Sequence, residues 1–371
     1  MSVRFYDGFE FFVLAAILSA PAIWLGVTER RIRGYGIFAS IVVILFVLKD
    51  SPKSILLLAA YLAYELLLVR LLLYLRSRGK AGKGIGRLVI ALAILPLILS
   101  KLAEQLNIGG FAILGLSYMT FKSVQVIIEI GDGIISDVDT ADYVYFNLFF
   151  PTILCGPIDR SRRFSADADS VMPKSEYLQL LGDAMTRFMT GVMYKFVFAN
   201  LLALAGTDRP YIYGVYMFFD FAGYSLMAIG LGNIWGIKTP DNFNKPWLSV
   251  DMRDFWNRWH ITLSTWLRDF VFSRLLRSCM RAKLLGGDRV YQACMCLMAN
   301  MLVMGVWHGL SANYIAYGLY HGVLLALTEL YQKKSGFYKR HKNETAYKAV
   351  SWFITMNLVM LGFEIFAGHI I

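Results

Sequence analysis

The strongest constraint on this chain is the length of its uncharged, apolar runs. Residues 290–328 are 39 consecutive positions without Asp, Glu, Lys or Arg, which is enough for two membrane spans at about 20 residues each. Other predominantly apolar runs of similar length cover residues 11–27, 34–48, 54–75, 88–106, 108–130, 177–206, 210–237 and 346–367. This pattern predicts an all-α, polytopic integral membrane protein.

Composition excludes most other classes. Hydrophobic residues make up 57% of the 371 positions and charged residues only 17%, whereas soluble domains have about 25% charged residues. Disordered, collagen-like, coiled-coil and ordinary cytosolic proteins are therefore excluded, and the chain has room for about ten spans and little else.

The basic residues indicate the orientation in the membrane. The net charge is +11, and Lys and Arg gather in short loops such as 29–33, 76–87, 274–289 and 332–342. Cytoplasmic loops carry such an excess, so we expect these loops inside and the N-terminus outside the cell. The first apolar run has a poor signal-peptide flank, and we interpret it as a retained span.

Residues 240–272 differ from the other segments because aromatic and charged residues alternate there. At 100° per residue, Trp256, Trp259 and His260 fall on one face of a helix and Asp254 and Arg258 on the opposite face. We therefore expect an amphipathic helix at the cytoplasmic interface, or a re-entrant one, with His260 on its apolar side.

The usual signatures of nucleotide, metal and hydrolase sites are absent from the sequence. The glycine-rich stretch at 79–84 lacks the Gly-Lys-Ser/Thr ending of a phosphate loop, and there is no Gly-x-Ser-x-Gly nucleophile elbow. The four cysteines have neither zinc spacing nor a disulfide framework. We predict no metal site and no bound cofactor.

The five histidines are the informative titratable residues. His341 and His369 lie near charged or terminal residues, whereas His260, His308 and His321 have apolar neighbours. A titratable group at membrane depth is costly and is by default a candidate functional residue, although a neutral histidine bonded to a neighbouring helix is the simpler alternative.

Residues around His308 suggest how it is held. Gly305 and Gly309 flank it at helical spacing, as Gly318 and Gly322 flank His321, and such pairs allow close helix packing. Candidates for lining a tunnel or orienting an imidazole are Trp256, Trp259, Asn300, Trp307 and Asn313. Trp307 lies beside His308, and the sequence does not show which of the two asparagines would orient an imidazole.

Several sequence blocks resemble the membrane-bound O-acyltransferase (MBOAT) family. They are GLSYMTFKSVQ (115–125), FFPTILCGPIDR (149–160), FDFAGYSLMAIGLG (219–232), DNFNKPWLSVDMRDFWNRWHITLSTWLRDFVF (241–272) and MGVWHG (304–309). Within the family, GPIDRSRRF, GIKTPDNFNKP and YGLYHG look most like the branch that transfers D-alanine to teichoic acids. The alginate-acetylating branch typically has an aspartate where this chain has Leu226.

The resemblance implies a fold and two catalytic residues. The implied fold is a bundle of about 10–11 transmembrane helices, with short re-entrant or interfacial helices, around a funnel and tunnel. It would form one membrane domain over 1–371, with N-terminal spans at 1–106, a catalytic core at 107–330, and a basic loop and last span at 331–371. His308 matches the near-invariant catalytic histidine of the family and His260 its second histidine.

The resemblance also implies the reaction and its partners. The donor would be D-alanine as a phosphopantetheine thioester on a cytoplasmic D-alanyl carrier protein (DltC-like), and the acceptor would be teichoic acid beyond a Gram-positive-type plasma membrane. Other membrane proteins of the Dlt system would assist, and nucleic acid would have no part. Polysaccharide O-acetylation of the alginate type, a proton-coupled transporter and a non-enzymatic scaffold stay open as alternatives.

A thioester donor agrees with the missing nucleotide site, because the acyl group arrives already activated. A neutral imidazole can take the proton of the attacking hydroxyl, and we predict His308 as this general base. His260 would orient the acceptor, or donate to the oxyanion or the leaving sulfur.

The basic segment 274–289 is a candidate docking site for the acidic carrier. It combines basic and apolar side chains, namely Arg274, Arg277, Met280, Arg281, Leu284 and Leu285, which supply steering charge and apolar anchors. The alternative is an ordinary positive-inside anchor.

Overall fold

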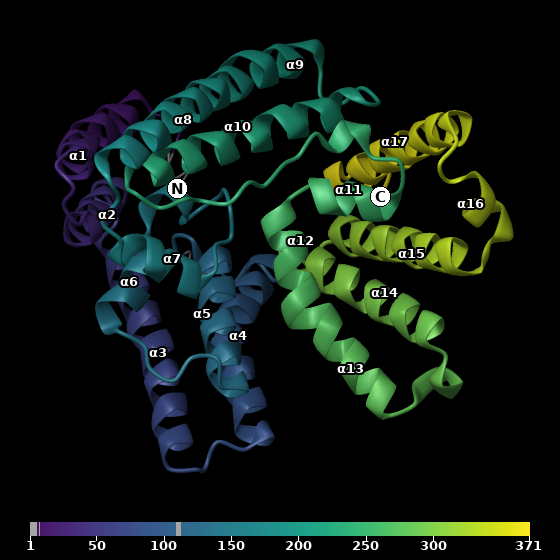
Figure 1. Ribbon diagram of the computed structural model, residues 1–371, viewed down its shortest axis with the longest axis horizontal. Helices are drawn as coiled ribbons and strands as arrows, with labels where there is room; N and C mark the ends of the chain where they lie inside the picture. Colours follow the sequence, from purple (N-terminus) through teal and green to yellow (C-terminus); the bar gives the residue numbers. More distant parts are fainter. Residues whose placement is uncertain (1–5, 7, 109–112) are drawn as a thin grey trace. The chain divides into compact units, whose positions relative to one another are not determined.

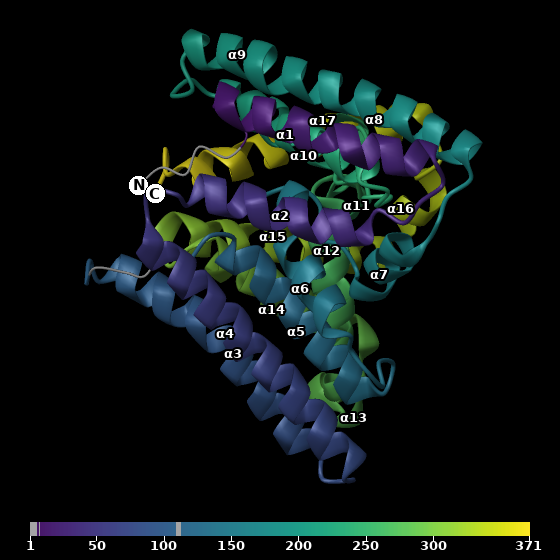
Figure 2. The same cartoon turned by 90° about the vertical axis from the view of Figure 1, so that its left-hand side faces the viewer.

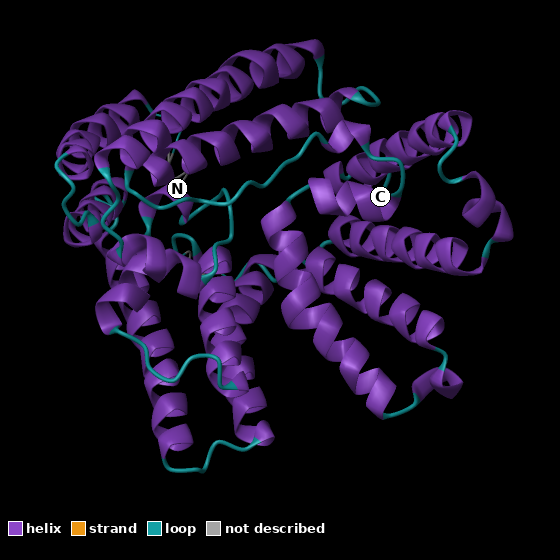
Figure 3. Ribbon diagram, viewed as in Figure 1, coloured by secondary structure: helices purple, strands orange, loops and turns teal. Residues whose placement is uncertain are grey.

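A computed structural model describes residue 6, residues 8–108 and residues 113–371 of the chain. In this described part every regular element is helical and none is a strand (Figure 3). The all-α class predicted from the apolar runs is confirmed.

Seven helices among the described residues are long and apolar enough to cross a membrane. They are Phe9–Val27, Pro52–Ser77, Lys83–Gln105, Lys174–Ala205, Ile212–Ile234, Arg289–His308 and Thr345–Ala367. The helix Arg33–Val47 is apolar but shorter. The protein is therefore multi-pass, while the count of 10–11 spans stays an expectation.

The chain forms two compact units, which we describe separately. The first unit comprises Met1–Met193 and Gly223–Pro240, and the second comprises Tyr194–Ala222 and Asp241–Ile371. Two continuous helical segments, 174–205 and 212–234, contribute to both units.

The first unit contains the N-terminal helices and the short elements that follow them. Its elements are α1 (Phe9–Val27), α2 (Arg33–Val47), α3 (Pro52–Ser77), α4 (Lys83–Gln105), α5 (Leu116–Asp132), α6 (Thr140–Leu148), the 3-10 turn η1 (Phe150–Thr152), α7 (Ser161–Asp169), α8 (Lys174–Met193) and the C-terminal half of α10 (Ile212–Ile234). Figures 1 and 2 show α3 and α4 as a hairpin with α5 beside it. Lys122 of α5 is buried and its Nζ donates to the Phe146 carbonyl at 2.8 Å, so this charge lies inside the protein and away from lipid.

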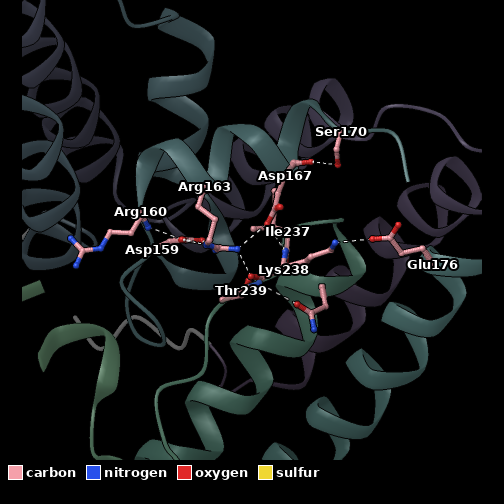
Figure 4. Close-up of polar contacts among 10 residues, drawn as sticks. Asp159, Arg160, Arg163, Asp167, Ser170, Glu176, Ile237, Lys238 and Thr239 are labelled. Carbon is pink, nitrogen blue, oxygen red and sulfur yellow. Dashed lines mark hydrogen bonds and ion pairs between the residues drawn. The ribbon is translucent and has the colours of Figure 1, made fainter. Parts of the chain in front are cut away.

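A charged clamp joins two of the sequence blocks within the first unit (Figure 4). Arg163 of α7 donates to Asp159 and, at 2.8 Å, to Asp167, and it also contacts the Lys238 carbonyl. The backbone N–H of Lys238 donates to the same Asp167 at 2.9 Å, and its Nζ donates to Glu176 at 2.7 Å. The GPIDRSRRF and GIKTP blocks therefore stabilise each other.

The second unit contains the C-terminal helices. Its elements are the π-helical turn η2 (Tyr194–Ala199), α9 (Asn200–Ala205), the N-terminal half of α10, η3 (Pro246–Leu248), α11 (Met252–Arg258), α12 (Ile261–Leu267), the π-helical turn η4 (Arg268–Phe272), α13 (Ser273–Arg281), η5 (Leu284–Gly287), α14 (Arg289–His308), α15 (Ala312–Lys334), α16 (Gly336–His341) and α17 (Thr345–Ala367). Helices α14 and α15 run side by side, joined by a short turn at residues 309–311, and α17 packs on α15.

The expectation of one amphipathic helix through residues 254–270 is wrong. The segment is broken into α11 and α12, and His260 lies between them with φ +43° and ψ 52° in the left-handed region. A right-handed helix cannot continue through that conformation, so the chain bends sharply at His260. We call this bend between α11 and α12 the elbow. Trp256, Trp259 and His260 are all buried.

Candidate active site

His308 is the last residue of α14 and lies in an aromatic pocket. Its ring centroid is 5.0 Å from that of Phe366 on α17 and 6.0 Å from that of Tyr314 on α15, while the Trp307 ring lies 4.6 Å away. The side chain is half-buried. The carbonyl end of α14 lies at this residue and favours positive charge there.

His260 is held at the elbow between α11 and α12 in the same unit. Its side chain is 4% exposed, and its ring meets the Phe221 ring of α10 edge-on at 4.7 Å. Its Nδ1 lies 3.3 Å from the Asn242 side-chain oxygen. Left-handed backbone at a residue other than glycine is uncommon and clusters at functional sites.

Electrostatics link the two histidines. Burial is the main cause that lowers the pKa of His260 to about 3, and the charge of His308 contributes in the same direction. His260 is therefore a neutral imidazole at physiological pH, and His308 lies near enough to influence it.

The two predicted tryptophans have different neighbours. Trp259 lies 4.9 Å from Phe363 of α17 and stacks on Phe255. The Trp256 ring instead meets His321 edge-on at 5.2 Å. Trp256 and Trp259 thus both line the interior beside the elbow, but they face different helices.

His321 belongs to the packed interior. It is fully buried against Phe255, Trp256, Tyr317 and Tyr320, and neither ring nitrogen has a hydrogen-bond partner among the described residues. A neutral imidazole suits this apolar setting.

The two candidate orienting asparagines lie at different places relative to His308. Asn300 is eight residues before His308 on α14, roughly 12 Å along the helix. Asn313 accepts from Ser311 at 2.5 Å and donates to the Phe366 carbonyl at 2.8 Å. Asn313 therefore ties the start of α15 to the aromatic residue that contacts His308.

Asn242, which the sequence did not single out, contacts the buried His260. It is 1% exposed and precedes His260 by 18 positions in the DNFNKP block. Its only signal in the sequence was its place in that block, because no periodicity relates a loop asparagine to a histidine two elements away.

A cavity of about 600 Å³ opens between the broken helix and α14–α15. Its lining includes Trp256, Asn300, Ser264, Leu276 and the ion pair of Arg253 with Glu329. The Asn300 side-chain oxygen is buried there without a hydrogen-bond partner among the described residues.

The predicted docking residues form an exposed surface at the end of α13. Arg277, Met280, Arg281, Leu284 and Leu285 are exposed and Arg274 is half-buried. Gln292 of α14 fixes the turn by donating to the Leu284 carbonyl at 2.8 Å. Leu285 has φ +51°, so the two leucines are presented on a tight, anchored turn.

These features describe a multi-pass helical membrane protein with a neutral, buried imidazole at His260 and a half-buried one at His308. The profile of the MBOAT, membrane-bound O-acyltransferase family, matches residues 207–367, a range that includes both histidines. A teichoic acid D-alanyltransferase of Bacillus subtilis is 37% identical over 98% of this chain and 98% of its own length. The teichoic acid D-alanyltransferase of Lacticaseibacillus rhamnosus is 34% identical over 100% of this chain and 98% of its own length. The chain belongs to the membrane-bound O-acyltransferase family and is an acyltransferase of that family.

A second group of relatives matches less of the chain. The probable alginate O-acetylase AlgI of Pseudomonas aeruginosa is 33% identical over 69% of this chain. The match covers 49% of that relative's own length, so half of the alginate protein has no counterpart here.

Proposed function

We propose that this protein transfers D-alanine from a phosphopantetheine thioester on a cytoplasmic carrier protein toward teichoic acid. The observation that supports this most is the end-to-end match with teichoic acid D-alanyltransferases, covering 98% of both chains for the Bacillus subtilis relative. Alginate-type acetylation is less favoured because that match is partial.

In the proposed reaction His308 is the general base. The hydroxyl oxygen of the acceptor attacks the thioester carbonyl while His308 takes the hydroxyl proton. The carbon–sulfur bond then breaks, an ester forms, and the proton passes to the leaving thiolate. The position of His308 at the end of α14 supports this role, since the helix carbonyls favour the transient imidazolium.

The carrier protein would dock on the exposed turn of α13 and η5. The basic side chains would steer an acidic partner, while Leu284 and Leu285 would bury against it. Two features support docking over a simple topological anchor. The leucines are 44% and 53% exposed, and the turn that carries them is anchored by Gln292. A segment that only sets the membrane topology depends on its number of Lys and Arg residues, and it needs neither exposed leucines nor an anchored turn.

We further propose a Gram-positive-type plasma membrane as the location, with the N-terminus outside the cell. The basic loops at 76–87 and 274–289 support a cytoplasmic side that also holds the carrier. The teichoic acid acceptor is then on the opposite, extracellular side of the membrane.

The test is a transfer assay with the purified protein in nanodiscs. D-Alanyl-carrier thioester and a poly(glycerol phosphate) acceptor are added, and both thioester loss and ester formation are measured. The proposal expects both, and expects acetyl-carrier to be a poor donor. An intact D-alanyl thioester would support a transporter or scaffold instead, and preferential acetyl transfer would support the alginate-type alternative.

A further inference from the structure

The side-chain oxygen of Asn242 receives three donors from the elbow. The Thr262 backbone N–H lies at 3.3 Å, the Thr262 hydroxyl at 2.6 Å and the His260 Nδ1 at 3.3 Å. The Asn242 backbone carbonyl also accepts from the Ile261 N–H at 2.9 Å. One buried asparagine therefore binds three consecutive residues of the turn.

The orientation of this amide follows from the Thr262 backbone. A backbone N–H is only a donor, so the Asn242 atom that faces it must be the oxygen. Turning the amide over would place its NH₂ group against that N–H, so the bond from the Thr262 backbone would be lost. The NH₂ group has no partner among the described residues, and this orphan donor is the cost of keeping the oxygen on the elbow.

The amide orientation in turn selects the tautomer of His260. Because Asn242 presents an oxygen, His260 must carry its proton on Nδ1 to make the 3.3 Å bond. A neutral imidazole has one protonated nitrogen, so its Nε2 then has a free lone pair.

We propose that Asn242 is a positioning residue that holds His260 as the Nδ1–H tautomer, so that Nε2 can only accept a hydrogen bond from the bound substrate, while His308 takes the proton of the attacking hydroxyl. This refinement rests on the proposed transfer reaction. It selects one of the two roles left open by the sequence: His260 orients the acceptor and is not the acid that protonates the oxyanion or the sulfur. Burial keeps the imidazole neutral, so no second proton is available on Nε2.

Two substitutions separate this role from simple packing. Asn242→Asp keeps an oxygen facing Nδ1 and Thr262, whereas Asn242→Leu keeps only the approximate volume. Asn244→Leu is the matched control, because Asn244 lies in the same segment with an exposed side chain.

The first measurement is nitrogen NMR of protein labelled with ¹⁵N-histidine, with the His260 signal identified by its loss in His260→Gln. The wild type and Asn244→Leu are expected to show Nδ1 protonated and Nε2 unprotonated at pH 7.5. Asn242→Asp should retain this tautomer and become protonated at a higher pH, since the new carboxylate favours the imidazolium. His260 protonated on Nε2 in the wild type would overturn the proposal.

The second measurement is the rate of transfer. Asn242→Leu should lower kcat at least tenfold with KM for the carrier unchanged, and Asn242→Asp should recover most of kcat at pH 7.5. Equal loss in both variants, with His260 unchanged by NMR, would mean a packing role and overturn the proposal. If Asn242→Leu does not fold, Asn242→Asp alone tests the proposal: it should keep the Nδ1–H tautomer of His260 and most of kcat, and loss of either would overturn the proposal. Absence of transfer in the wild type would refute the proposed function and leave the tautomer result standing.

Discussion

Gly305 of α14 and Gly318 of α15 face each other where the two helices cross. A side chain on Gly318 would lie 3.1 Å from the Gly305 Cα and 2.6 Å from the Met301 carbonyl oxygen. Backbone contact at this crossing is possible only without side chains. Since His308 is one turn beyond Gly305, the crossing sets the direction in which α14 ends.

Replacing Gly318 with leucine should therefore separate the helices. Overpacking of this kind costs about 1–3 kcal/mol, so we expect a lower melting temperature and a reduced transfer rate. Gly336→Ala is the control, because a Cβ there meets nothing within 4 Å. Unchanged melting of Gly318→Leu would contradict the close crossing.

Removing the imidazole of His308 should abolish transfer while the protein still folds. General bases contribute about 10²–10⁴ in rate, so His308→Ala should lose at least 100-fold in the nanodisc assay. His341→Ala, in the exposed α16 region, should keep the wild-type rate. Near-normal D-alanine ester in cells that carry only His308→Ala would refute the assignment.

The low pKa of His260 predicts a pH dependence of stability. The pKa of His260 is about 3 in the folded protein, below the ordinary value of 6.5. Between pH 3 and pH 6.5 the folded state therefore binds fewer protons than the unfolded state. The stabilisation is fully present above pH 6.5 and is lost progressively as the pH falls toward 3. Melting temperatures from pH 7.5 to 4.5 should fall further in the wild type than in His260→Gln. Parallel curves would contradict the burial of a neutral His260.

Changing Leu284 and Leu285 together to aspartate should weaken carrier binding without altering topology. Both side chains are exposed, so the change removes apolar contacts and adds charge that repels an acidic partner. Surface plasmon resonance with the carrier should show at least a tenfold higher Kd. Neutral replacement of Arg277 and Arg281 should instead slow association and flatten its salt dependence. Unchanged affinity after the leucine substitutions would move the docking site elsewhere.

Arg163 should be needed for stability and its neighbour Arg162 should not. Burial raises the pKa of Asp159, and Arg163 opposes this rise, so Arg163→Ala leaves a buried carboxylate without its main partner. Breaking such a pair costs about 3–5 kcal/mol in a buried setting, and half-exposure of Arg163 reduces this figure. We expect a clear fall in melting temperature for Arg163→Ala and little change for the exposed Arg162→Ala. Similar melting of the two variants would show that the clamp is not needed.

The amino-acid sequence by itself determined the class of the protein and most of its helices. Apolar runs such as 54–75 and 346–367 became α3 and α17 within a few residues, because helix length and apolarity are local properties that the bilayer enforces. The same reasoning singled out His260, His308 and His321, since a titratable residue stands out among apolar neighbours. The family resemblance then selected His260 and His308.

Only the tertiary structure decided how these residues are arranged. Nothing local to residues 254–270 shows the break at His260, because the left-handed turn is held by Asn242, 18 positions earlier. The same applies to Asn313, whose amide binds α17 through Phe366. These hydrogen bonds join residues distant in sequence, and helical periodicity describes only neighbours along one element. The physical reason is that a tautomer, a helix break or an ion pair depends on which donor meets which acceptor after packing.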